Sequence, residues 1–73
     1  MEPNERIREL ERRAEAHYDA MYQTRYPSAE YADAKDYFGD AIALARQIGE
    51  LKTAERLEAR LAHIKAVFRS QFA

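Results

Sequence analysis

The sequence contains no cysteine and no tryptophan, and it has only two glycines and two prolines among its 73 residues. Without cysteine, disulfides cannot hold the chain together, and two histidines alone do not supply a structural zinc site. Few glycines and prolines leave few breaks, which predicts long helices joined by short connections. The missing cysteine also fits a reducing cytoplasm, which is the location we expect.

An excess of charge of one sign and a long apolar run are also missing. Twelve basic and 13 acidic residues give a formal net charge of −1, so no global charge attracts nucleic acid or a membrane surface. No stretch approaches the roughly 18 to 20 apolar residues that span a bilayer, and the charged first residues do not resemble a secretory signal. We therefore expect no membrane contact, and the balance of charges disfavours a nucleic-acid partner.

The clearest pattern lies in residues 31–48, where apolar residues recur at alternating steps of three and four. These are Tyr31, Ala34, Phe38, Ala41, Ala45 and Ile48. At 100° per residue such positions form one stripe along an α-helix. Tyr37, Ile42 and Leu44 widen the stripe to an arc of about 160°, more than one neighbouring helix covers. The pattern predicts a central helix packed between two others.

Two further segments show the same spacing, and two breaks separate the three. We expect helices over about residues 4–25, 29–48 and 53–72, with breaks near Pro27 and Gly49. Matched lengths and short loops imply antiparallel neighbours. The predicted fold is an all-α, antiparallel three-helix array that forms a single domain over residues 1–73.

The ends of these helices also carry local signals. Gly49 is placed as the left-handed residue that ends the second helix, with Leu51 folding back on its last turn. Glu9 and Arg13 are spaced to form an ion pair along the first helix. The predicted starts are Pro3 in the first turn or Asn4 as cap, then Ser28 and Thr53 as caps.

The central helix contains Ala34, Phe38 and Ala41 in the pattern A-x3-F-x2-A. This stretch resembles the second helix of a tetratricopeptide repeat, in which small and aromatic residues let two paired helices approach closely. Carried back along the chain, the resemblance places Tyr18 at the large aromatic position of the first helix and Met21 at the following aliphatic one. The resemblance implies a helical hairpin that binds partner peptides.

The resemblance covers about half of the chain. Tyr22, Arg25 and Arg46 depart from the residues that the family favours, and the third helix does not repeat the motif in frame. Ordinary helix packing without a repeat therefore remains the alternative interpretation of the same residues.

Five tyrosines gather near the first predicted break: Tyr18, Tyr22, Tyr26, Tyr31 and Tyr37. A tyrosine buries its ring but needs a partner or water for its hydroxyl group, so it suits half-buried edges and interfaces. The cluster is interpreted either as the rim of the core or as a surface for self-association or partner binding. Stacking of nucleic-acid bases is disfavoured because no basic groove accompanies the rings.

The histidines do not indicate catalysis. His17 lies on the inward stripe of the first helix, where a hydrogen-bonded core residue is expected, and His63 lies on the outer face of the third. A catalytic histidine needs an orienting acid and a reacting cleft, and the sequence names neither. No Glu-x-x-His pair suggests a carboxylate metal site in a bundle. We therefore expect no enzyme, no cofactor and no metal.

Charged residues form two strips. Asp33, Asp36 and Asp40 share the exposed side of the central helix, and a basic strip on the third helix consists of Lys52, Arg56, Arg60 and His63. Both strips are interpreted as solvated faces. The functional alternative is that they meet across a subunit interface and fix its register.

Gly39 is the one residue that the central helix does not favour locally. It shares a flank with Ala32 and Ala43. Such a flank is either simply exposed or lets a helix of a second subunit come close.

These observations predict a small, non-enzymatic helical module that binds another protein and associates with itself, most simply as a dimer. The tyrosine cluster is its candidate surface. A small regulatory or nucleic-acid-associated protein is the alternative. The protein partner and the biological process stay unidentified.

Overall fold

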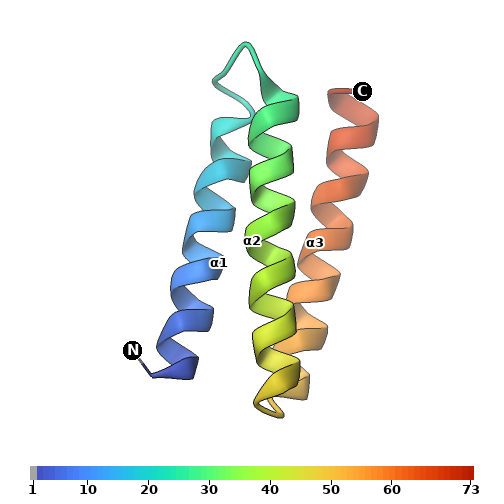
Figure 1. The fold of residues 1–73 in the computed structure, drawn as a ribbon. Coiled ribbons are helices and arrows are strands. Elements are labelled where there is room, and N and C mark those ends of the chain that lie inside the picture. The colour runs from blue at the N-terminus through green and yellow to red at the C-terminus, as the bar shows by residue number, and fades with distance from the viewer. Residues whose placement is uncertain (1) are drawn as a thin grey trace.

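The computed structural model describes residues 2–73, and these residues form three α-helices and no strand. The helices are α1 (Pro3–Ala20), α2 (Pro27–Gln47) and α3 (Leu51–Gln71). Figure 1 shows α2 between the other two, with the α1–α2 loop and the C-terminus at one end of the molecule and the N-terminus at the other. α2 packs against both neighbours, and Figure 1 shows that each runs antiparallel to it. The predicted antiparallel three-helix array is confirmed.

The first helix begins with Pro3 in its first turn, which is one of the two predicted starts, and it ends earlier than predicted. Pro3 occupies the first turn, and the carboxylate of Glu2 accepts a hydrogen bond from the backbone N–H of Asn4 at 3.0 Å. α1 stops at Ala20, not near residue 25. The following N–H groups bond to carbonyl groups three residues back, for example Gln23 to Ala20 at 3.0 Å, which tightens the chain into turns.

The second helix starts at the proline itself. Pro27 is its first residue and Tyr26 its N-cap, so Ser28 lies inside the first turn and does not cap the helix as predicted. The fixed φ of proline suits the first helical position, and its missing N–H needs no partner there. Tyr26, the residue before Pro27, is held by a hydrogen bond from its N–H to the hydroxyl oxygen of Thr24 at 3.1 Å.

The turn after α2 has the predicted glycine but differs in its details. Gly49 has φ +79°, the left-handed conformation that ends a helix. α3 starts at Leu51 with Glu50 as N-cap, so Thr53 lies inside the helix and is not a cap. Leu51 is 61% exposed and does not fold back on α2. The early start of α3 turns this side chain into solvent.

The core follows the predicted stripe of α2. Ala34, Phe38, Ala41 and Ala45 are completely buried, and Phe38 is the largest of the fully buried side chains. Tyr31 and Ile48, at the two ends of the stripe, pack against the core while partly exposed. The buried apolar residues from the rest of the chain are Ile7, Leu10, Ala14, Tyr18, Met21, Ala54, Leu57 and Ile64.

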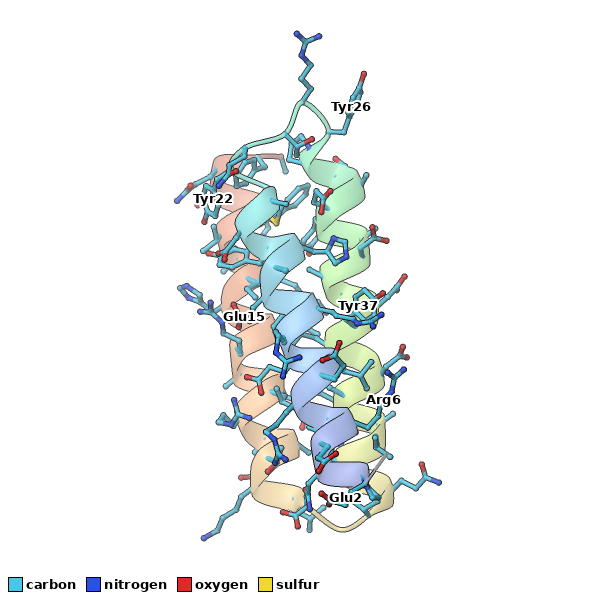
Figure 2. All side chains as sticks on the ribbon, turned by 90° about the vertical axis from the view of Figure 1, so that its left-hand side faces the viewer. Glu2, Arg6, Glu15, Tyr22, Tyr26 and Tyr37 are labelled. Carbon is cyan, nitrogen blue, oxygen red and sulfur yellow. The ribbon has the colours of Figure 1, made fainter. Side chains whose placement is uncertain are left out.

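Charged side chains join α1 to α3, which run in the same direction. The guanidinium of Arg56 donates two hydrogen bonds to Glu11, at 2.7 and 3.0 Å, and that of Arg60 donates two to Glu15, at 2.7 and 2.8 Å. In Figure 2 Glu15 lies on the side of α1 next to α3. These two arginines of the basic strip therefore pair within the chain.

The remaining surface carries exposed charges. Asp33, Asp36 and Asp40 are exposed along α2, as predicted. The predicted pair of Glu9 and Arg13 is present, with Nε of Arg13 at 2.9 Å from the carboxylate. Among residues 2–73, no helix combines the length and the apolar character that a membrane span requires.

Gly39 lies on an exposed face of α2 together with Ala32 and Ala43, and a methyl group added there would meet no heavy atom within 4 Å. This geometry favours the interpretation that the flank of Ala32, Gly39 and Ala43 is simply exposed. We expect Gly39→Ala to raise the free energy of unfolding by about 0.5 to 1 kcal/mol, because alanine is the better helix former. Thermal unfolding followed by circular dichroism measures the change. A lower melting temperature would indicate instead that a second helix packs on this flank in solution.

Candidate functional site

The structure separates the five tyrosines of the predicted cluster. Tyr18 is buried at 9% exposure, whereas Tyr22 and Tyr26 are 50% and 73% exposed. Tyr31 and Tyr37 are half-buried. Figure 2 shows Tyr22 and Tyr26 at the loop end of the bundle and Tyr37 further along α2. The five tyrosines therefore differ in burial and do not form a single surface cluster.

Three of the five tyrosines belong to a row of aromatic rings at the loop end, and a fourth, Tyr37, belongs to a separate, smaller group. We call Tyr18, Tyr22, Phe72, Phe68 and Tyr31 the aromatic row. Neighbouring ring centroids in this order are 5.5, 5.3, 5.9 and 3.9 Å apart. The first two contacts are edge-to-face and the last two are stacked. The row passes from α1 over α3 to α2 and so ties all three helices together.

Phe68 and Phe72 fall within the helix predicted over residues 53–72, but the sequence alone did not join them to the tyrosines. The available signal was topological. Because the three helices alternate in direction and have similar lengths, the end of α3 must return to the level of the first loop. Two aromatic residues near that end are therefore expected beside Tyr22 and Tyr31, and the structure places them there.

Cations lie over two rings of the aromatic row. Nζ of Lys35 is 4.5 Å from the centroid of the Tyr31 ring, and the guanidinium carbon of Arg60 is 5.2 Å from that of Tyr18. A cation over an aromatic face is attracted by the negative face of the ring. Arg60 therefore makes two kinds of contact between α3 and α1, the hydrogen bonds to Glu15 and the cation–π contact with Tyr18.

Tyr37 belongs to a smaller group around His17. The imidazole of His17 stacks on the Tyr37 ring with centroids 5.5 Å apart. Its Nδ1 shares a hydrogen bond with Oε2 of Glu30 at 2.6 Å, and Asp33 lies 3.9 Å away. The predicted hydrogen bond is present, but His17 is half-buried between α1 and α2 and is not a core residue. His63 is exposed on α3, as predicted.

Tyr18 and Tyr22 share a hydrogen bond between their hydroxyl groups at 2.8 Å. This bond, together with burial of the ring, raises the pKa of Tyr18 to about 12. The fold thus favours the neutral phenol. Since a tyrosine in an unfolded chain has a pKa of about 10, the stability that neutral Tyr18 contributes is complete below that pH. It is lost as the pH rises towards 12.

We expect near-ultraviolet absorbance to show one tyrosine that ionises late, at a pH of about 12. Tyr22→Phe removes the hydrogen-bond partner and should move this late step towards pH 10. Tyr26→Phe, in the exposed loop, is the matched control and should leave the late step unchanged. Circular dichroism at each pH confirms that the helices persist. A late step unchanged in Tyr22→Phe would contradict the assignment.

The loop end also supplies the exposed apolar surface. We define the tyrosine end as Tyr22, Tyr26, Tyr31 and Phe72. Tyr22 and Tyr26 are two of the three large apolar side chains that are exposed within residues 2–73. The part of the chain that the structure describes contains no pocket and no cluster of potential metal ligands. Comparisons with models of protein families, with curated proteins and with solved structures found no match.

Proposed function

We propose that this chain is a small protein-binding module that acts without catalysis, associates with a second copy of itself and uses the tyrosine end as its contact surface. The observation that carries the proposal is the exposure of Tyr22 and Tyr26 at one end of the bundle, at 50% and 73%. Tyrosine is enriched among the residues that dominate binding energy, because its ring is large and its hydroxyl group tolerates water. The proposal places the protein in the cytoplasm, in keeping with a chain that has no cysteine.

The small size of this surface is typical of a weak, reversible association. A tyrosine buries roughly 200 Å², so the exposed fractions of Tyr22 and Tyr26, 50% and 73%, amount to about 250 Å². Two copies would together bury about 500 Å² from these rings, and more from the edges of Tyr31 and Phe72. Contacts below about 1,200 Å² are typical of weak or transient complexes. We therefore expect a dissociation constant in the micromolar range.

The partner is not needed to complete the core. The accessible surface is 4809 Å², close to the roughly 4,650 Å² expected for a monomer of 8.5 kDa. Association therefore occurs between already folded chains, and it should be rapid and reversible on dilution.

Sedimentation equilibrium tests the proposal. At about 100 µM, roughly a hundredfold above a micromolar constant, the chain should sediment as a dimer. The variant Tyr22→Ser/Tyr26→Ser should sediment at 8.5 kDa. Leu51→Ser is the matched control, because it removes the third exposed apolar side chain at the other end and should leave the dimer intact. A monomeric wild type, or a double variant that still dimerises, would reject the tyrosine end as the self-association surface.

A further inference from the structure

The connection between α2 and α3 consists of three residues, Ile48, Gly49 and Glu50. The N–H of Gly49 donates to the carbonyl of Arg46 at 3.1 Å, and that of Glu50 donates to Ala45 at 2.8 Å. This pattern ends a helix through one left-handed residue, and Gly49 is the only residue with positive φ among residues 2–73. The reversal of the chain therefore depends on the backbone of a single glycine.

The residues on both sides of Gly49 favour a helix. Apart from Ile48, Gly49 and Thr53, the segment 45–56 (ARQIGELKTAER) consists of alanine, arginine, glutamine, glutamate, leucine and lysine, which are all good helix formers. α3 also starts without a side-chain hydrogen bond to its first N–H groups, since Glu50 provides none. If residues 48–50 became helical, α2 and α3 would join into one helix from residue 27 to residue 71, about 67 Å long.

We propose that two copies of this chain exchange α3 by straightening residues 48–50, so that the α3 of each copy packs on the α1–α2 hairpin of the other. Identical chains remake every contact of α3 between copies. The two hydrogen bonds of Arg56 to Glu11, those of Arg60 to Glu15 and the stacking of Phe68 on Tyr31 all return. Only the turn changes its conformation.

The exchange also covers Leu51. This side chain is 61% exposed beside the turn and has no role in the core of the single chain. In the exchanged dimer the two straightened segments cross at the two-fold axis, where residues of one copy meet the same residues of the other. Leu51 of each copy then lies beside this crossing and gains an apolar contact that exists only in the dimer, whereas Ile48 already packs against the core of the single chain.

The exchange goes beyond the association proposed above, because it uses the turn and not the tyrosine end. It requires α3 to leave its own hairpin, which exposes buried Leu57 and Ile64 for the duration of the step. The exchanged dimer therefore forms slowly, mainly during refolding at high concentration, and persists after dilution. A dimer held by the tyrosine end dissociates at once on dilution. The two modes can fail independently.

Refolding at high concentration, followed by dilution and size-exclusion chromatography, tests the role of the turn. Gly49→Ala should increase the persistent dimer about tenfold over wild type, because alanine is strained at φ +79° and favours the straight helix. Gly39→Ala is the matched control, since the same change in an open part of α2 should leave the dimer fraction unchanged. Leu51→Pro should abolish the persistent dimer, because proline suits the first position of α3 but breaks a continuous helix.

Complementary charge reversal tests the identity of the exchanged element. One chain carries Glu11→Arg and Glu15→Arg, and the other carries Arg56→Glu and Arg60→Glu. Each alone places like charges across the α1–α3 contact, whereas a mixed dimer with exchanged α3 restores opposite charges at both contacts. A chain with all four changes controls for folding, since it restores opposite charges within one molecule. Refolding the two chains together should give a persistent heterodimer with a higher melting temperature than either alone. A mixture that shows only the dimer fractions and melting temperatures of the separate chains would overturn the proposal.

Discussion

Phe38→Ala should lower the free energy of unfolding by about 3 to 5 kcal/mol. Phe38 is completely buried and is the largest of the fully buried side chains, at the centre of the helix that contacts both neighbours. Truncation removes the apolar area of the ring and leaves a cavity that the surrounding helices fill only in part. A chain of 73 residues is stable by about 4 to 11 kcal/mol in total, so the loss should remove at least about a quarter of that stability, and all of it at the lower end of the range.

Urea denaturation followed by circular dichroism measures this loss, with Tyr26→Ala as the matched control. The control also removes an aromatic ring, but from a side chain that is 73% exposed, so its free energy of unfolding should change by less than about 0.5 kcal/mol. If Phe38→Ala lost less than about 1 kcal/mol, the core would not be centred on this residue.

Ala41→Leu should be destabilising by about 3 kcal/mol, at the upper end of the range for overpacking. Ala41 is completely buried, as are Ala14 on α1 and Ala34 and Ala45 on α2. A stripe of such small residues leaves no room for three further carbon atoms between the helices. The larger side chain must push α1 or α3 away from α2, which weakens the contacts of Phe38 as well.

Ala43→Leu is the matched control for this prediction. Ala43 lies two residues along the same helix but is exposed, and leucine and alanine are both good helix formers. Its free energy of unfolding should therefore stay within about 0.5 kcal/mol of wild type. Equal losses in the two variants would mean that the small residues at the buried positions are not required for close packing.

The central part of the fold could be predicted because local signals and packing agree there. Ala34, Phe38 and Ala41 mark one face of a helix by their spacing alone, and all three are completely buried. Gly49 could be assigned as the end of α2 because few other residues adopt a positive φ. The likeness of this region to a tetratricopeptide repeat stays a prediction.

The end of α1 could not be predicted from periodicity. The apolar pattern continues through Met21, which is 1% exposed although it lies beyond the last helical residue. Turns with hydrogen bonds over three residues keep such a side chain facing the core while the helix itself has ended. Spacing therefore indicates which side chains are buried and leaves the exact boundary open.

The candidate site was predictable only in part. Local pairs such as Glu9 with Arg13 follow from their spacing, but Glu11 with Arg56 depends on how α1 and α3 align in space. The exposure of each tyrosine likewise depends on tertiary packing. Tyr18 and Tyr22 are one helical turn apart in sequence, yet one is 9% and the other 50% exposed. Tyrosine tolerates both environments, so its identity alone does not decide between them.

Amide chemical shifts recorded over about a hundredfold range of concentration, centred on the micromolar constant expected for the dimer, test most directly whether the tyrosine end is the contact surface. The proposed function predicts that the amide signals of Tyr22, Tyr26 and Phe72 shift most with concentration, in rapid exchange between monomer and dimer. The signals of Asp36 and Asp40, on the exposed face of α2, should shift little. A spectrum that does not change with concentration, or shifts confined to the exposed face of α2, would contradict it.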